Sequence, residues 1–416
     1  MNLALPQSIS VGKGDQEMSV DDNRAVPPLG DDPGALSALM SQESLMSWAA
    51  QAPQWDRENS FARNAIRELA STGVMGATFS VQDGGQGASL RQVLEAVRLA
   101  SLYTGVLGRV IVDSNLGPAA MIATYGNGAM RHEVLAATRN GNKPAIAITE
   151  PDAGSAASDL TTSVLRDTTG KLSLTGQKKW ITGAPESSHY VVFARFDATP
   201  GSRGIGLVLA RKEQLGIEFG VAPRMMGMRG LPEGSISFDN YSLSEDDIIL
   251  PPGDGFKRGM EIYNSQRLGA AMVACSVAES ALNMAIEYAR SRRQFDRPIG
   301  DNQGLRWMLA DMAIDVETAL AYLRRVADDA DRSGNRFSPN PVEVAMAKIK
   351  SAEMAIRVTN GALQVFGARG YDTEQPVERL CRDARMFTIA GGTAEMLRNL
   401  VGKAVLSDVT PRGLYR

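Results

Sequence analysis

The chain of 416 residues has few of the residue types that disulfide, metal and triad chemistry need. It contains only two cysteines, Cys275 and Cys381, and both lie inside helical patterns, so we expect a reducing compartment and no disulfide framework. Two histidines, His132 and His189, are too few for a histidine-rich metal site or a histidine-based triad. We expect both histidines to be solvated at the surface.

Charge and hydrophobic runs exclude two further classes of protein. The formal net charge is −3 with the signs interspersed, so we expect no nucleic-acid partner. No uninterrupted apolar run approaches the roughly 18 residues of a membrane span, and the first residues lack the basic start of a secretion signal. These features predict a cytoplasmic protein without a membrane span.

Hydrophobic periodicity divides the chain into four parts. Residues 1–34 are rich in Ser, Asp, Gly and Pro without periodicity, which predicts a mobile N-terminal arm. A helical period over 35–142 predicts an α-helical domain, and alternation over 143–252 predicts a mostly antiparallel β domain. Four helical stripes over 253–416 predict a four-helix bundle. The expected fold is mainly α with a central β domain.

Two polar segments of the β domain suit ligand binding. Residues 145–155 form a short apolar run, with Ile146 and Ile148 as strand residues, that turns into small residues with accessible backbone N–H groups. In residues 176–183, Trp180 and Thr182 are two positions apart and so share one face of a strand. Together the segments resemble the T-E-P-x-A-G-S turn and the G-x-K-x-W-I-T strand of the acyl-CoA dehydrogenase family. The resemblance implies that family's fold and an FAD cofactor.

Three segments of the bundle extend this resemblance to residues from about 65 to 408. Residues 288–299, 362–367 and 382–385 look like the family's Y-A-x-x-R-x-Q-F-G-x-P-I, Q-x-F-G and R-D-A-R/K segments. An arginine such as Arg292 can bind pyrophosphate oxygens bidentately and stays charged, although a solvated helix end is the alternative.

The resemblance assigns FAD contacts to two groups of residues. Contacts within the same subunit are implied for Ile148, Thr149, Ser155, Trp180, Thr182, Thr393 and Glu395. Contacts to the FAD of a neighbouring subunit are implied for Arg292, Gln294, Phe295, Gln303 and Gln364. The second group implies a homo-oligomer, either a dimer or a tetramer.

The catalytic base of the family is missing at both of its usual positions. Family members remove the α proton of an acyl thioester with a Glu at one of two places. Gly391 stands at one of them and Gln266 at the other, and neither can accept a proton near neutral pH. The Gly391 backbone N–H remains to hold the thioester oxygen as negative charge develops. The same resemblance assigns Gln266 and Arg267 to the catalytic centre, and Tyr263, Asn264 and Arg267 to substrate binding.

Three functions follow from this departure. The first is a flavoenzyme acting on a thioester of CoA or a carrier protein, in which substrate acidity, or a base from substrate or solvent, replaces the Glu. The second is a flavin oxygenase or oxidase of specialised metabolism, and the third is a non-catalytic FAD-binding subunit. The electron acceptor is expected to be O2 or an electron-transfer flavoprotein.

Overall fold

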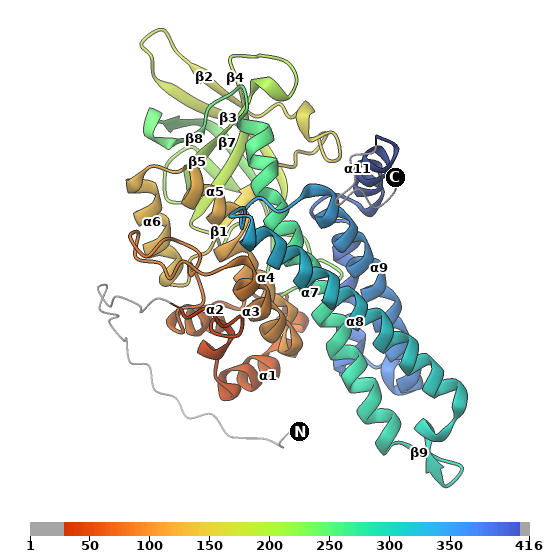
Figure 1. Cartoon of the computed structure of the whole chain (residues 1–416). Helices are drawn as coiled ribbons and strands as arrows, with labels where there is room; N and C mark the ends of the chain where they lie inside the picture. Colours follow the sequence, from red (N-terminus) through yellow and green to blue (C-terminus); the bar gives the residue numbers. More distant parts are fainter. Residues whose placement is uncertain (1–28, 408–416) are drawn as a thin grey trace, which may run out of the picture.

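The computed structural model describes residues 29–407, so the arm predicted over residues 1–34 falls almost wholly outside it. The described residues run from a helical region through a β-sheet to a second helical region (Figure 1), which confirms the predicted fold class. The helices before the sheet are α1 (Gln42–Glu58), α2 (Arg63–Ser71), α3 (Leu90–Tyr103), α4 (Gly105–Asn115), α5 (Pro118–Tyr125) and α6 (Gly128–Arg139).

The sheet has the order β6-β7-β3-β2-β4-β5-β8, with β1 also paired to β4. Its strands are β1 (Pro144–Ala147), β2 (Ser163–Arg166), β3 (Leu172–Thr182), β4 (His189–Phe196), β5 (Ile205–Arg211), β6 (Ile217–Phe219), β7 (Glu233–Leu243) and β8 (Ile248–Leu250). Every pairing is antiparallel except those of β1 and β2 with β4, which confirms the mostly antiparallel prediction. Ile146 lies in β1 as expected, whereas Ile148 was wrongly placed in the strand and belongs to the turn after it.

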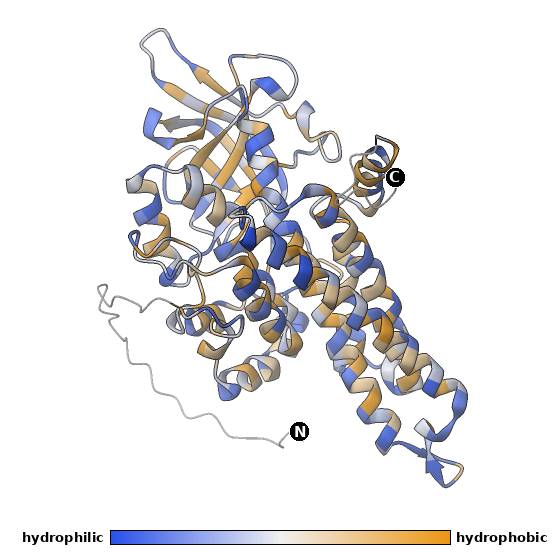
Figure 2. Ribbon diagram, viewed as in Figure 1, coloured by the Kyte–Doolittle hydropathy of each residue, from blue (hydrophilic) through white to orange (hydrophobic). Residues whose placement is uncertain are grey.

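The helices after the sheet are organised around the long helix α7. They are α7 (Gly255–Ser291), α8 (Gln303–Arg332), α9 (Pro341–Phe366), α10 (Pro376–Arg385) and α11 (Ala394–Leu406), with a small hairpin, β9 (Arg293–Gln294) and β10 (Arg297–Pro298), between α7 and α8. α7 is buried on most sides because α3 and α4 pack against one side and α8 and α9 against the other. Figure 2 shows the hydrophobic colours gathered on the sheet and on inward helix faces, with the hairpin mainly hydrophilic.

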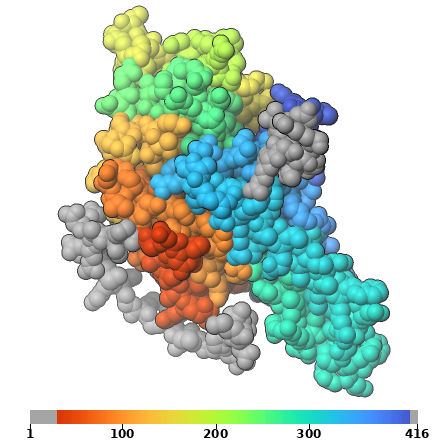
Figure 3. Space-filling model, in the orientation of Figure 1, coloured from red at the N-terminus to blue at the C-terminus, as the bar shows by residue number. Residues whose placement is uncertain are grey.

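The C-terminal helical domain is present as predicted, but the interpretation of its apolar stripes needs correction in two places. The region has three long helices, and the fourth stripe falls on the short helix α11, where Met396 and Leu400 are exposed. In α8 the predicted apolar stripe is buried from Met312 to the C-terminal end of the helix. Met308 of the same stripe and the neighbouring Trp307, in the first turns of the helix, are exposed. Figure 3 shows this end of α8 and the hairpin projecting at the lower right of the molecule.

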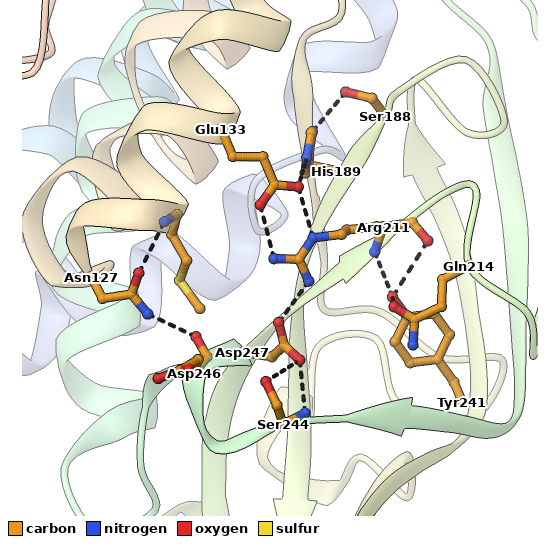
Figure 4. Close-up of polar contacts among 11 residues, drawn as sticks. Asn127, Glu133, Ser188, His189, Arg211, Gln214, Tyr241, Ser244, Asp246 and Asp247 are labelled. Carbon is orange, nitrogen blue, oxygen red and sulfur yellow. Dashed lines mark hydrogen bonds and ion pairs between the residues drawn. The ribbon is translucent and has the colours of Figure 1, made fainter.

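The prediction for His189 is also wrong, because its side chain is 6% exposed at the contact between α6 and the sheet. Its Nε2 lies 2.9 Å from Glu133 Oε1. The Glu133 carboxylate also accepts hydrogen bonds from Arg211, from Nε at 2.7 Å and from Nη2 at 2.9 Å (Figure 4). Arg211 Nη1 donates to Asp247 at 2.6 Å. Burial lowers the pKa of His189, although Glu133 opposes the shift. This network fixes α6, and through α5 and α4 the N-terminal helices, against the sheet.

Two helical stretches, Gly105–Tyr125 and α7, are long and apolar enough to cross a membrane by length and composition, contrary to the expectation that none would be. Their most apolar windows are 94% and 72% buried inside the protein. Core helices of soluble proteins share these properties, so the two helices are weak evidence for a membrane span.

Candidate active site

The turn after β1 is fastened to β3 by a buried ion pair. The Glu150 carboxylate accepts hydrogen bonds from Lys178 Nζ at 2.8 Å and from the backbone N–H groups of Thr161 and Thr162 at 2.7 and 2.9 Å. Burial by itself raises the pKa of Glu150, but Lys178 and these donors outweigh it and lower that pKa to about 2. The backbone N–H of Lys179 also donates to Thr149. These bonds bring the turn beside the end of β3, although the two are some thirty positions apart in the sequence.

Trp180 and Thr182 lie at the end of β3, beside the turn that follows β1. The register between β3 and β7 shifts between Lys178 and Ile181, a β-bulge that leaves Trp180 with φ +59°. The indole is 50% exposed although it is one of the largest apolar side chains. The predicted same-subunit residues of the sheet are therefore adjacent, and Ser155 is exposed at the turn beside them.

A pocket beside this edge is lined by residues from four parts of the chain. Its lining is Arg109, Tyr263, Gln266, Arg267, Ala270, Lys348, Met386, Phe387, Ala390 and Gly391. The structure thus brings together all three residues predicted to be catalytic, with Tyr263 beside them. Gly391 has φ +77°, which a residue with a side chain would adopt only with strain.

Two cations hold the turn that carries Gly391. Arg267 Nε donates to the Gly391 carbonyl and Lys348 Nζ to the Gly392 carbonyl, each at 2.7 Å. Arg267 Nη1 donates to the Asn264 amide oxygen at 2.8 Å. Asn264 is not among the residues that line the pocket, and its amide oxygen is engaged by Arg267, so its substrate contact stays a prediction. Both cations donate to carbonyl oxygens, so neither of these bonds uses the Gly391 backbone N–H.

Behind Gln266 lies a cluster of buried charges. Gln266 is 3% exposed, and its Nε2 donates to Asp113 Oδ1 at 3.0 Å. The Asp113 carboxylate lies 2.9 Å from Arg109 Nη1 and 2.9 Å from Lys143 Nζ. One carboxylate therefore faces two cations, and Arg109 extends to the pocket wall. Burial lowers the pKa of Lys143, whereas Asp113 opposes that shift.

Sequence reasoning missed five charged residues of this region. They are Arg109, Asp113, Lys143, Glu233 and Lys348. Arg109 and Asp113 sit four positions apart in the otherwise apolar helix α4, and an oppositely charged pair inside an apolar helix is the signal that could have indicated them. The other three do not belong to an oppositely charged pair within an apolar helix and carry no comparable signal.

The second group of predicted FAD residues is not brought to this site. Arg292, Gln294, Phe295, Gln303 and Gln364 are exposed at the far end of α7 (Figure 1), which at 37 residues is about 55 Å long. Phe295 at the tip of the hairpin is 94% exposed. Thr393 is the N-cap of α11 and Glu395 is exposed on the first turn of that helix.

Comparison with known proteins settles the family. The models of the N-terminal, middle and C-terminal domains of acyl-CoA dehydrogenase match residues 42–142, 145–241 and 253–406. This chain belongs to the acyl-CoA dehydrogenase family. Members of this family are FAD-dependent enzymes, and this chain is one that acts on CoA thioesters.

Several relatives and solved structures cover nearly the whole chain. A 3-sulfinopropanoyl-CoA desulfinase of Paraburkholderia xenovorans is 42% identical over 371 residues, covering 88% of this chain and 93% of the relative. A 3-(aryl)acrylate reductase of Clostridium sporogenes is 32% identical, covering 85% of this chain and 93% of the relative. The structure of butyryl-CoA dehydrogenase from Megasphaera elsdenii superposes with a TM-score of 0.85 at 29% identity, covering 91% of this chain and 99% of that chain.

The residues present fit FAD. A half-exposed indole, the hydroxyls of Thr149, Ser155 and Thr182 and a turn of small residues offer an aromatic face and polar contacts to a flavin ring. A Cβ added at Gly154 would meet nothing within 4 Å, so this turn leaves space for a ligand. When bound, FAD supplies a hydride acceptor for the acyl chain. The role expected of the protein's own residues is to bind the thioester, with the Gly391 backbone N–H toward its oxygen.

Lys348 offers a test of how the Gly391 turn is held. Replacing Lys348 with Met is expected to lower kcat/KM about tenfold, because the charge-assisted bond to Gly392 is lost and the turn loosens. Burial is the main cause that lowers the pKa of Lys348 to about 8, so the charged side chain costs stability and the melting temperature should not fall. Steady-state kinetics and thermal unfolding measure both effects. Lys350→Met, on an exposed position of the same helix, is the matched control; an equal loss in both variants would contradict the assignment.

Proposed function

We propose that this protein removes an anionic sulfur group from the β carbon of a short acyl-CoA, as a 3-sulfinopropanoyl-CoA desulfinase. The observation that carries the proposal is the burial of Arg109. This residue is 6% exposed and lines the pocket around Gln266, Arg267 and Gly391, which we call the acyl pocket. Its Nε has no hydrogen-bond partner within residues 29–407. A buried N–H group without a partner is costly, and an anionic substrate group would accept a charge-assisted hydrogen bond from it.

The charge balance supports an anionic substrate. Arg109 and Lys143 lie beside the carboxylate of Asp113, and Glu233 also faces both cations, but its pKa is raised to about 7, so it is only partly ionised at neutral pH. An acyl chain that carries a negative group would neutralise the remaining positive charge. A plain fatty acyl chain would leave that charge unpaired. The name of the Paraburkholderia relative, at 42% identity, points to a sulfino group as this anion.

The missing base also fits the proposal. In the net reaction the bond from carbon 3 to sulfur breaks, a C–H bond forms at that carbon and sulfur takes up the oxygen of water. 3-Sulfinopropanoyl-CoA and water thus give propanoyl-CoA and hydrogen sulfite. Carbon keeps the electron pair of the broken bond, so no external electron acceptor is consumed and no net α proton is removed. A neutral Gln266 in place of a Glu avoids repulsion between a carboxylate and the anionic substrate.

The test is an anaerobic assay of the FAD-loaded protein with 3-sulfinopropanoyl-CoA and no added electron acceptor. Sulfite and propanoyl-CoA are expected to form in equal amounts. Consumption of O2 in step with turnover under air would instead favour the oxygenase alternative. A flavin that no thioester affects would favour the non-catalytic subunit.

Assembly into a dimer or tetramer is part of the proposal. Arg292→Ala is expected to weaken FAD retention by about 10- to 100-fold, since a charge-assisted bond to a phosphate oxygen is worth roughly 1.5–3 kcal/mol. The side chain is exposed, so the fold should survive. FAD content after gel filtration and the mass of the wild-type particle measure the two effects, with Arg290→Ala as the control. A wild-type monomer with full FAD content would contradict the proposal.

A further inference from the structure

Glu233 is a carboxyl group next to Thr182, at the strand end that the family resemblance places against FAD, and neither that resemblance nor the proposed function assigns Glu233 a role. It is the first residue of β7 and pairs directly with Thr182, the last residue of β3, in the antiparallel register. Directly opposite residues of antiparallel strands project to the same face of the sheet. Accordingly, the Thr182 hydroxyl donates to Glu233 Oε1 at 2.7 Å.

Thr182 is fixed from a second side as well. Lys143 Nζ lies 3.2 Å from the Thr182 backbone carbonyl, and the same ammonium group pairs with Asp113. The charged cluster behind Gln266 is therefore joined to the strand end that the family resemblance places against FAD. A change of charge at Glu233 acts on Thr182 through one direct hydrogen bond.

The surroundings of Glu233 allow that charge to change near neutral pH. Arg109 and Asp113 of α4, Lys143 before β1 and Tyr263 of α7 are the charged and titratable groups that face it. Burial is the largest influence and raises the pKa of Glu233 to about 7, although the Thr182 hydrogen bond, Arg109 and Lys143 oppose the shift. Asp113 adds to it.

A hydroxyl group has a single proton, so the state of Glu233 fixes what Thr182 can do on its other side. A carboxylate only accepts, so the Thr182 proton must point at Glu233 and the hydroxyl can only accept elsewhere. A protonated carboxyl group can donate to the hydroxyl oxygen, and the Thr182 proton is then free to point away from Glu233.

We propose that Glu233 is a positioning residue that sets the direction of the Thr182 hydrogen bond, and thereby whether Thr182 donates to or accepts from the flavin ring. The flavin edge is in this way coupled to the charge of the acyl pocket. The inference rests on FAD binding by the family fold and does not depend on desulfination.

The experiment follows the absorbance spectrum of the FAD-loaded protein without substrate between about pH 6 and 8, where the group is expected to titrate. The visible bands should shift with a single apparent pKa near 7 in the wild type. Glu233→Gln should abolish the shift, because an amide does not titrate. Glu218→Gln, an exposed glutamate of β6, should leave it unchanged.

A second variant keeps the inference testable if Glu233→Gln loses FAD. Thr182→Val keeps the carboxyl group and a β-branched strand residue but removes the hydroxyl, so the spectral shift should disappear. A wild-type spectrum that does not change over this range would overturn the proposal. The same apparent pKa in Glu233→Gln or Thr182→Val would overturn it equally. Because no substrate is present, a failure of the desulfinase assay leaves these outcomes unaffected.

Discussion

Replacing Arg109 with Met is expected to lower kcat/KM for 3-sulfinopropanoyl-CoA by about 10²–10³-fold, because breaking a buried ion pair costs roughly 3–5 kcal/mol. The substrate anion would then lie in a buried pocket without its guanidinium partner. Folding should survive, because Asp113 keeps Lys143 Nζ at 2.9 Å and Gln266 Nε2 at 3.0 Å.

A comparison of the effect on 3-sulfinopropanoyl-CoA with the effect on propanoyl-CoA makes this prediction specific. Propanoyl-CoA carries no anionic group at carbon 3, so its dissociation constant should change little in Arg109→Met. Arg109→Lys keeps the charge but loses the planar donor pair, and an intermediate rate is expected. Arg98→Met is the matched control, since Arg98 pairs with Glu279 outside the pocket. Equal weakening of sulfinated and plain thioesters would show that Arg109 only supports the fold.

The second large effect is expected from Gln266→Glu, which should introduce acyl-CoA dehydrogenation. The two side chains have nearly the same shape, and the introduced carboxyl group could accept the α proton, a role worth on the order of 10²-fold. Stopped-flow loss of oxidised-flavin absorbance under argon, with saturated acyl-CoA substrates of different lengths, measures the gain. The wild type should bleach slowly or not at all.

The neighbours of Gln266 add a pH dependence to this prediction. The introduced carboxyl group would face the Asp113 carboxylate that now accepts from Gln266 Nε2, and two adjacent carboxylates raise the pKa of one of them. The bleaching rate of the variant should therefore rise with pH. Arg109 and Lys143 beside Asp113 limit the shift.

Gly391→Glu is the comparison variant, because Gly391 stands at the other position where family members carry the base. A Cβ there would approach only Arg267 Cγ, at 3.7 Å, but the φ of +77° strains any residue other than glycine. We expect a smaller gain than in Gln266→Glu. If the wild type already bleaches as fast as Gln266→Glu, another group serves as the base and the assignment of Gln266 is wrong.

Much of the fold could be read from the sequence because its signals are local. The period of the apolar residues changes near 143 and again near 253, and the strands of the large sheet fall between Pro144 and Leu250. Trp180 and Thr182, predicted to share one strand, both lie at the C-terminal end of β3. The predictions for the stripes of α8 and α11 were partly wrong. The sequence does not distinguish an apolar helix face that packs inside the chain from one that is exposed on the surface of the chain.

The residue identities that the sequence supplied at the centre of the site were those inside motifs: Gln266, Arg267 and Gly391. Their surroundings depended on tertiary structure. Arg109 and Asp113 come from α4, Lys143 from the segment before β1, Glu233 from β7 and Lys348 from α9, and they meet only because the sheet and α4 both pack against α7. The charge of a side chain is set by its type, whereas its burial, its partners and its pKa are set by neighbours that are distant in the sequence. The sequence therefore determined the family and the FAD cofactor, and by resemblance it predicted that Gly391 and Gln266 replace the usual base. Only the tertiary structure showed two buried cations sharing one carboxylate beside the acyl pocket, the feature on which the proposed anionic substrate rests.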